Sequence, residues 1–281
     1  MPELPEVEIT ARLIGKAVSG LKVTSASAGG IGTLKSVSPR LDSLSGSSIT
    51  QVWRRGKHLL IDFDNDTTLL LHLMSAGRLQ LFDKKASLRD RTARLNLDLE
   101  DGRQLRLREF GTRHSCWAKL LLTGTVQEEE SVSTLGPEAW PAPSNLADIL
   151  NGPRPLNTML RDQRVIAGIG RSWADEILHA ARLSPFKRGS DLTAEEVDSL
   201  RSAVDELLGG AVAHYETTLS IPIPDKYPMP LHIHRNNGSP CPRCNGVIEA
   251  VFYENHVMCY CPECQTQGKV LKDRRLSKLL K

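Results

Sequence analysis

Residues 241–264 read CPRCNGVIEAVFYENHVMCYCPEC and contain five of the six cysteines in this chain of 281 residues. Cys241 and Cys244 form one CxxC pair, and Cys261 and Cys264 form a second. Two such pairs on tight turns are typical of four thiolates that hold one Zn²⁺ tetrahedrally. A closed site of this kind stabilises a fold and takes no direct part in catalysis. The stretch therefore predicts a zinc finger.

The remaining cysteines are expected to pack in apolar surroundings. Cys259 could pair with Cys261 as CxC, but the matched CxxC spacing favours the other four residues as the metal ligands. Cys116 stands beside Trp117 in an apolar stretch and predicts a core position. The acidic, proline-bearing start of the chain is unlike a secretion signal, and no apolar run approaches the roughly 20 residues that span a bilayer. These features predict a cytoplasmic protein that does not bind membranes.

The first 122 residues change from a helical to a strand-like pattern. Residues 3–18 predict a helix, because apolar side chains recur four apart and Gly20 is placed to end it. Beyond it apolar and polar residues alternate, and Asp, Asn and Gly residues separate the runs. Short strands of this kind predict an antiparallel β-sandwich or barrel. The clearest strand candidates are residues 59–63, 69–73, 79–82, 95–99 and 105–108.

The second half of the chain predicts a linker followed by helices. Residues 128–145 are acidic and then proline-rich, which indicates a linker. Helices are expected at 146–150 and 156–166, and Thr193 with Glu196 makes a capping box that begins a long helix. Residues 220–230 are rich in proline and predict a loop.

A Gly168-Ile169-Gly170 turn precedes a further helix candidate. Backbone amides at the start of that helix could bind a phosphate in a helix–turn–helix unit. Taken alone, the motif favours a plain connecting turn.

The N-terminus, MPELPEVE, offers a second kind of chemistry. Methionine before proline is readily removed, which would leave Pro2 with a free secondary amine. The pKa of an α-amino group is about 7.7–8, so part of it is unprotonated near neutrality and able to form a Schiff base. Glu3 beside the amine and Glu6 one turn along are candidates for acid–base work. The plainer interpretation is that proline and glutamate simply begin a helix well.

The motifs together resemble the formamidopyrimidine-DNA glycosylase and endonuclease VIII family, in its formamidopyrimidine branch. They occur in the family's order and spacing over nearly the whole chain, and the four-cysteine module follows them. They are Met1–Glu8, Arg54–Leu60, His72–Gly77, Arg108–Gly111, Leu135–Glu138 and Ile169–Ala174.

The resemblance implies an α+β, two-lobed enzyme. It implies an antiparallel β-sandwich with a catalytic N-terminal helix, a helical lobe with a helix–two-turns–helix motif, and a zinc finger holding one structural Zn²⁺. The corresponding segments are 1–130, 131–225 and 226–266, with a basic tail at 267–281. Members flip a damaged nucleotide out of duplex DNA, cut its glycosidic bond and break the strand by β,δ-elimination. We therefore expect a monomer whose partner is duplex DNA containing damaged bases or abasic sites.

Site residues follow from the same resemblance. Pro2 would be the nucleophile at the sugar C1′, and Glu3 the acid–base residue that opens the ribose. Lys57 would contact a phosphate at the lesion, and Glu6 would help to set the helix. Arg108 and Phe110 match residues that fill the space left by the flipped base. Without the family match these two are plain strand residues.

Three DNA-contact positions depart from the family pattern. The intercalating methionine aligns with Ser75, while Met74 lies one residue early, and a one-residue shift turns a side chain to the other face of a strand. Arg171 replaces a phosphate-binding asparagine, and its guanidinium keeps phosphate affinity. His256 replaces the zinc finger's usual arginine and is only partly charged near neutrality.

Two further departures concern the segments that flank the zinc finger. The loop from 219 to 231 is short where the family caps a flipped 8-oxoguanine, so oxidised pyrimidines, ring-opened purines and abasic sites stay open as substrates. The tail holds six Lys or Arg residues between 269 and 281 and one Asp, and is expected to add non-specific DNA affinity. The net charge of the whole chain is only +3.

The alternatives to an enzyme are a damaged-DNA-binding protein without turnover and a zinc-ribbon scaffold. The first explains the altered DNA-contact positions but not the retention of Pro2, Glu3, Glu6 and Lys57. The second explains the cysteines alone.

Overall fold

The computed structural model describes residues 1–29, 32–86, 90–111, 114–244, 246–253 and 256–271. The predicted tail therefore lies outside the described residues from position 272 onward. The chain forms two compact units: unit 1 contains residues 1–134 and 212–228, and unit 2 contains residues 135–211 and 229–281.

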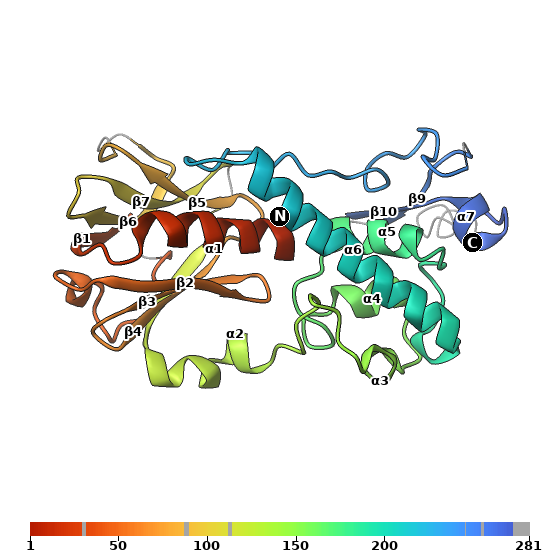
Figure 1. The fold of residues 1–281 in the computed structure, drawn as a ribbon, viewed down its shortest axis with the longest axis horizontal. Coiled ribbons are helices and arrows are strands. Elements are labelled where there is room, and N and C mark those ends of the chain that lie inside the picture. The colour runs from red at the N-terminus through yellow and green to blue at the C-terminus, as the bar shows by residue number, and fades with distance from the viewer. Residues whose placement is uncertain (30–31, 87–89, 112–113, 245, 254–255, 272–281) are drawn as a thin grey trace. The chain divides into compact units, whose positions relative to one another are not determined.

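One helix, a run of strands, a run of helices and a final strand pair with a short helix follow one another along the chain (Figure 1). The helices are α1 (Leu4–Val18), α2 (Glu130–Ser133), α3 (Leu146–Leu150), α4 (Leu156–Arg161), α5 (Arg171–Ala180), α6 (Ala194–Thr218) and α7 (Pro262–Thr266), with 3₁₀ turns η1 (Leu41–Leu44), η2 (Thr123–Glu128) and η3 (Gly189–Asp191). The strands are β1 (Val23–Ala28), β2 (Ile49–Arg55), β3 (His58–Phe63), β4 (Thr67–His72), β5 (Gly77–Phe82), β6 (Ala93–Leu99), β7 (Gln104–Glu109), β8 (Trp117–Leu122), β9 (Glu249–Tyr253) and β10 (His256–Tyr260).

Unit 1 is built on two four-stranded antiparallel sheets, in the orders β1-β6-β7-β5 and β2-β3-β4-β8. In β6 the alternating Leu95, Leu97 and Leu99 are buried while the residues between them are partly exposed, as a strand with one face toward a core requires. The predicted antiparallel sandwich is confirmed, and all five strand candidates lie in β3 to β7.

Helix α1 packs against β2 and β3 of one sheet and β5 of the other. Its apolar stripe, including Val7, Ile14 and Val18, is fully buried. The helix ends before Gly20, whose φ of 84° favours a residue without a side chain. The predicted helix at 3–18 is confirmed, with Glu3 as the residue that caps it.

A segment far along the sequence completes unit 1. We call residues 212–228 the strap; it holds the end of α6 and the proline-rich loop predicted from the sequence. Ile223 is fully buried and Tyr227 is 5% exposed. The buried amide of Gln80 on β5 donates hydrogen bonds to the carbonyl oxygen of Ile223 and, at 3.0 Å, to the carboxylate of Asp225. The strap is therefore part of the core of unit 1.

Three rings lie in contact across the second sheet of unit 1, with His72 stacked on Trp117 and edge-on to His58. Strand pairing places His72 opposite both His58 and Trp117, with ring centroids 4.8 and 5.7 Å from that of His72. Burial lowers the pKa of His58 to about 4 and, together with the nearby charge of His58, lowers the pKa of His72 to about 3. Both histidines are neutral in the folded protein at neutral pH.

This cluster predicts a loss of stability in acid. Unfolded histidine binds a proton below a pKa of about 6.5, whereas the folded His58 and His72 bind one only near pH 4 and 3, so stability falls as the pH drops from 6.5 toward 4. At pH 5 the loss is about 2 kcal/mol for each histidine. Hydrogen exchange in β3 and β4 measures it. His72→Asn is expected to flatten the dependence, and the exposed His214→Asn to leave it unchanged. Equal pH dependence in all three proteins would contradict the assignment.

Unit 2 is organised around two buried acids of α5. One carboxylate oxygen of Glu176 accepts the backbone N–H groups of three consecutive residues, 232–234, at 2.8–3.1 Å. Asp175 accepts from the His234 ring at 2.7 Å and from the N–H of Cys259 on β10 at 3.0 Å. These bonds satisfy both carboxylates and fix the chain before the cysteine module to α5.

The helices of unit 2 match the prediction except in α4 and the linker. The predicted helix at 156–166 ends at Arg161, because the Asp162 carboxylate accepts the N–H of Arg164 and turns the chain. The Thr193–Glu196 capping box is confirmed at the start of α6 by hydrogen bonds of 2.9 and 3.3 Å. Within the predicted linker, the structure forms the single helical turn of α2.

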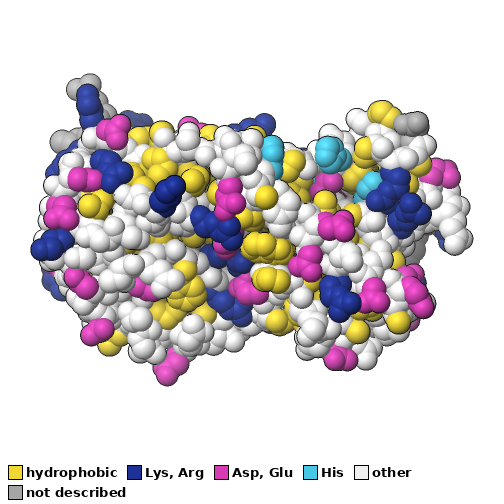
Figure 2. Space-filling model, in the orientation of Figure 1, with side chains coloured by type: hydrophobic (Ala, Val, Ile, Leu, Met, Phe, Trp, Pro, Cys, Tyr) yellow, Lys and Arg dark blue, Asp and Glu magenta, His cyan; other side chains and the backbone are white. Residues whose placement is uncertain are grey.

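Basic and acidic side chains are interspersed on the face drawn in Figure 2, in keeping with the small net charge. Any strongly basic site must therefore be local. Among the described residues, no helix has the length and the apolar character needed to cross a membrane.

Candidate functional site

The N-terminal end of α1 gathers three predicted site residues. Pro2 immediately precedes the helix and is buried, and Glu3 is 2% exposed. The Glu3 backbone N–H donates to Glu6 Oε2 at 2.8 Å, one half of a capping box. Met1 is 49% exposed, so an aminopeptidase could remove it without disturbing the core. Its removal would free the Pro2 amine directly beside Glu3.

Glu6 is completely buried and receives a second donor from the strap. The Tyr215 hydroxyl donates to Glu6 Oε1 at 2.8 Å, across 209 positions of sequence. Tyr215 is itself fully buried, and burial followed by the charge of Glu6 raises its pKa far above the ordinary value for tyrosine. The phenol therefore stays protonated and acts as a donor.

Lys57 and Met74 lie at the same end of one sheet. Lys57 follows Gly56 in the β2–β3 turn, where the φ of 56° at Gly56 suits glycine, and it is 6% exposed. The pairing of His58 with His72 brings the residues before β3 beside those after β4. Met74 follows β4, is half-buried with a φ of 50°, and donates its N–H to His72 Nδ1 at 3.0 Å.

The loop after β4 also contacts Phe110. The Phe110 N–H donates to the carbonyl of Ala76 at 3.2 Å, so the Met74 loop and Phe110 are neighbours at one end of unit 1. Ser75 is exposed and Met74 half-buried, both in this loop. Met74 and Ser75, the two candidates for the intercalating position, thus lie in the same turn.

Arg108 lies on β7 with its guanidinium held by several partners. Its Nε donates to Thr92 at 2.9 Å, and one terminal nitrogen donates to Gln80 at 3.1 Å and lies 3.4 Å from the carboxylate of Asp225. The guanidinium also stacks 4.7 Å from the ring centroid of Phe110. Arg108 and Phe110 therefore form one unit that is connected to the strap.

The basic run at 54–58 carries fewer accessible charges than its composition indicates. The Arg54 side chain is 8% exposed and bound to Glu8 Oε2 of α1 at 2.7 Å. His58 is neutral at pH 7, as shown above. Arg54 thus fastens α1 to β2, and Lys57 is also buried at 6% exposed.

In unit 2 the turn before α5 is built by one side chain. The Gln163 amide accepts the N–H of Gly168 at 2.9 Å and donates to the carbonyl of Ile169 at 2.8 Å. Gly168 has a φ of 110°, and Gly170 is the residue that caps α5. The turn delivers Arg171, exposed, at the first position of the helix.

Arg171 and His256 share a site with a third residue, Arg161. The Arg161 guanidinium lies 3.1 Å from His256 Nε2, and His256 stacks on Tyr253 with ring centroids 4.3 Å apart. Burial, then the charges of Arg161 and Arg171, lowers the pKa of His256 to about 4. His256 is therefore neutral near pH 7, whereas the sequence predicted a partly charged side chain. The positive charge of this site comes from the two arginines.

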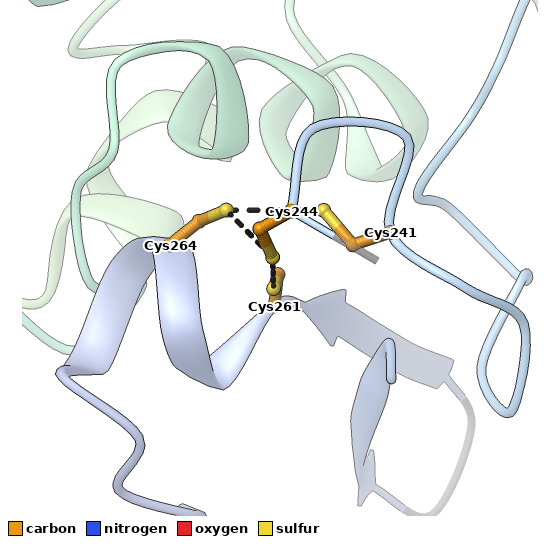
Figure 3. A group of neighbouring side chains, drawn as sticks. All are labelled: Cys241, Cys244, Cys261 and Cys264. Atoms are coloured by element: carbon orange, nitrogen blue, oxygen red, sulfur yellow. Dashed lines mark hydrogen bonds between the residues drawn. The ribbon is translucent and has the colours of Figure 1, made fainter. Parts of the chain in front are cut away.

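Four cysteines of unit 2 converge on one point (Figure 3). The sulfur atoms of Cys241, Cys244, Cys261 and Cys264 all lie within 4.8 Å of one another, with sulfur–sulfur distances of 3.8, 3.5 and 3.4 Å for three of the pairs. A tetrahedral Zn²⁺ with Zn–S bonds of about 2.3 Å implies sulfur–sulfur distances of about 3.8 Å. The donor set and its size fit a metal ion.

The cysteine module is tied by hydrogen bonds to the end of α5 and to the residues that follow it. His179 Nε2 lies 3.2 Å from Cys241 Sγ, within hydrogen-bond reach of a thiolate ligand. Arg243 donates to the carbonyls of His179 and Ala180 at 2.8 and 3.1 Å, and Gln265 donates to that of Leu183 at 2.8 Å. A metal in this module would therefore stabilise more than the two knuckles.

The other two cysteines are buried. Cys259 is 1% exposed, its sulfur accepts the N–H of Arg235, and burial raises its pKa to about 11. Cys116 is 3% exposed, and burial raises its pKa to about 12. The prediction that Cys116 belongs to a core is confirmed.

Three residues with evident roles were absent from the sequence-based site. Tyr215 is a single aromatic residue near the end of an amphipathic helix, where it is indistinguishable from a core residue. Arg161 ends α4, a usual place for a cation. Gln163 stands five residues before Gly168, and a glutamine so close to a glycine turn is the one signal that could have indicated a turn-fixing side chain.

Comparison with known proteins agrees with this geometry. Residues 1–113 match the family model of the formamidopyrimidine-DNA glycosylase N-terminal domain, and residues 136–222 match that of the formamidopyrimidine-DNA glycosylase H2TH domain. The formamidopyrimidine-DNA glycosylase of Pediococcus pentosaceus is 32% identical over 278 residues, covering 94% of this chain and 99% of the relative. That of Chloroflexus aurantiacus is 33% identical over 285 residues, with 94% and 98% covered.

Solved structures extend the likeness to three dimensions. The Lactococcus lactis Fpg in complex with DNA containing N7-benzyl-Fapy-dG has a TM-score of 0.83 and 25% identity, covering 94% of this chain and all of that one. The same enzyme in complex with DNA containing an abasic site has a TM-score of 0.82 and 25% identity, with 94% and 99% covered. The predicted two-part fold with a helix–two-turns–helix region and a four-cysteine cluster is confirmed. The chain belongs to the formamidopyrimidine-DNA glycosylase family.

Proposed function

We propose that this chain excises oxidised bases from duplex DNA as a base-excision-repair glycosylase and then cleaves the abasic strand by β,δ-elimination. The observation that carries the proposal is the reacting end of α1. Pro2 stands there beside the nearly inaccessible Glu3, whose backbone is held by the buried carboxylate of Glu6. A binding protein without turnover has no use for a terminal amine placed beside buried acids.

In this proposal the amine nitrogen of Pro2 attacks C1′ of the damaged nucleotide. The glycosidic bond breaks, and the base leaves with the bonding electron pair and takes up the proton that the Pro2 nitrogen loses. Glu3 donates a proton to the ring oxygen as the sugar opens, which leaves a Schiff base between Pro2 and C1′. Lys57, on the neighbouring turn, supplies a cation for a phosphate beside the lesion. Met74, Phe110 and Arg108 occupy the space that the flipped nucleotide leaves. The hydrogen bond from Phe110 to Ala76 in the Met74 loop and the stacking of Arg108 on Phe110 support this role.

Arg161 and Arg171 complete the proposal in unit 2 as ligands of a backbone phosphate at the N-terminus of α5. The four cysteines would hold one Zn²⁺, which would contribute structure and no chemical step. We further propose that residues 1–130, 131–225, 226–266 and 267–281 supply the catalytic part, the helical part, the zinc finger and the DNA-binding tail of a monomer, except that the strap at 212–228 packs into unit 1.

Solved structures of related proteins are complexes with DNA containing N7-benzyl-Fapy-dG, carbocyclic 8-oxo-G or an abasic site. The short loop from 219 to 231 leaves oxidised pyrimidines as a second substrate class. Duplexes carrying an abasic site, 8-oxoguanine, a formamidopyrimidine or thymine glycol, each reduced with borohydride after mixing, test the proposal. A covalent adduct supports it and ranks the lesions. Tight binding to every duplex without any adduct would instead make the chain a damaged-DNA-binding protein.

Phosphate contacts predict how affinity depends on salt. Arg161→Ala and Arg171→Ala are each expected to reduce the magnitude of the slope of log affinity against log salt concentration by about 1, equally for all DNA sequences. Each arginine that binds a phosphate releases about one counterion from the DNA. His256→Asn should leave the slope unchanged, since His256 is uncharged at pH 7. Fluorescence anisotropy of labelled duplex DNA at salt concentrations from about 50 to about 200 mM measures this slope. A slope of smaller magnitude for His256→Asn would show that this histidine becomes protonated when DNA binds.

A further inference from the structure

The strap brings a buried tyrosine into contact with the reacting end of unit 1. Glu6 Oε1 accepts the Tyr215 hydroxyl at 2.8 Å, and Glu6 Oε2 accepts the Glu3 N–H at 2.8 Å. The peptide group that carries this N–H is the one that joins Pro2 to Glu3. A single carboxylate therefore connects Tyr215 to the peptide of the proposed nucleophile.

The tyrosine is suited to orient that carboxylate. Its pKa is raised first by burial, then by the charge of Glu6, and further by Tyr227 and Glu3, so the phenol lies in the field of both acids and remains protonated. A protonated hydroxyl bound to a carboxylate makes a stronger hydrogen bond than one between neutral groups. With one oxygen fixed by Tyr215, the other is directed at the Glu3 N–H.

The strap fixes the tyrosine in turn. The Tyr227 hydroxyl and Thr10 Oγ1 lie 2.6 Å apart, and the Tyr215 and Tyr227 ring centroids lie 6.3 Å apart. The Arg78 guanidinium stacks 5.0 Å from the Tyr227 ring centroid. Together with the bonds from Gln80 described above, these contacts fasten both ends of the strap to α1 and β5. Tyr215 is thus placed before any substrate arrives.

We propose that Tyr215 is a positioning residue for the N-terminal proline, acting through Glu6 to set the direction of the Pro2 amine. The proposal rests on the function proposed above. Attack on C1′ requires close alignment, and small misplacements of a reacting group cost up to about a hundredfold in rate. Tyr215→Phe removes one oxygen atom and keeps the ring. It is expected to slow covalent adduct formation on the order of tenfold and to leave the affinity for the same duplex unchanged.

The test is single-turnover borohydride trapping on abasic duplex DNA, with affinity measured in parallel. Tyr227→Phe is the matched control, because it also deletes a buried hydroxyl from the strap. That hydroxyl is hydrogen-bonded to Thr10 and not to Glu6. Glu6→Ala removes both acceptors. If Tyr215 acts through Glu6, Tyr215→Phe costs nothing further in the Glu6→Ala background, whereas independent effects would multiply. The double variant also leaves no buried hydroxyl without a partner, so it remains informative if either single variant is unstable.

The outcomes distinguish a failure of the positioning role from a failure of the proposed function. Absence of an adduct with the unaltered protein overturns the proposed function, whatever Tyr215 does. If the unaltered protein and the Tyr215→Phe variant form the adduct at the same rate, the positioning role alone is overturned. Equal slowing by Tyr227→Phe, or multiplicative effects with Glu6→Ala, also overturns it, because either result assigns the effect to general integrity of the strap.

Discussion

A chain that carries two extra residues ahead of Met1, so that the methionine is retained, is expected to form no covalent adduct with abasic DNA. In that chain the Pro2 nitrogen belongs to an amide, and its lone pair is delocalised into the carbonyl group. The covalent route is then closed. We expect the trapped adduct to fall on the order of a thousandfold, with affinity for the same duplex nearly unchanged, because Met1 is 49% exposed.

Denaturing gels of the reduced complexes measure the adduct, and mass spectrometry of the cross-linked peptide locates it. A matched control has a protease site that ends immediately before Pro2, so that cleavage of the extension restores the amine and the adduct. An undiminished adduct in the extended chain would assign the nucleophile to another amine. Lys57, which lies in the turn before β3, is then the residue to replace.

Loss of the metal is expected to abolish DNA affinity by disordering the cysteine module. Structural Zn²⁺ sites of this kind contribute about 10–16 kcal/mol of apparent binding free energy, which exceeds the stability of a small module. Chelation should release one Zn²⁺ per chain and remove hydrogen-exchange protection from β9, β10 and α7. The loss should extend to the C-terminal part of α5, since Arg243 bonds to the carbonyls of His179 and Ala180 there.

Single substitutions distinguish ligands from bystanders. Cys244→Ser is expected to lose the metal, because Cys244 is one of the four clustered residues and its exposure rules out a packing role. Cys259→Ala and Cys116→Ser, both outside the cluster, should retain one metal ion per chain. Metal content after dialysis measures this. Retention of the metal by a Cys264→Ser variant together with its loss by Cys259→Ala would replace the Cys261–Cys264 pair with the CxC alternative, Cys259 and Cys261.

Local patterns were sufficient to predict much of the fold. The alternation in residues 95–99 marks a strand with one buried face, and the same register appears in β6. The two CxxC pairs predict a four-sulfur cluster, because the two cysteines of each pair lie on one turn. The cluster then forms as soon as the two turns meet. The capping box at Thr193 is likewise visible within four residues. Each of these signals is short in sequence.

The parts that escaped prediction are interactions between distant segments. Tyr215 and Glu6 are 209 positions apart, and Gln80 and Ile223 are 143 apart. Arg161 and His256 are separated by 95 positions, and burial together with the charges of the nearby arginines keeps the histidine neutral where partial charge was expected. Periodicity indicates that such residues are buried or polar, but it carries no information about which partner they meet. The strap was accordingly predicted as a plain loop.

The division of unit 1 into residues 1–134 and 212–228 bears on how the protein is made. A ribosome releases the chain from its N-terminus, so α1 and both sheets emerge long before Tyr215 and Tyr227 exist. During that interval Glu6 and Thr10 lack their tyrosine partners, and the N-terminal half waits for a segment synthesised some two hundred positions later. A nascent or truncated chain that stops before residue 212 therefore cannot assemble the finished N-terminal end. The N-terminal end that we propose to be reactive is complete only once Tyr215 and Tyr227 have been synthesised.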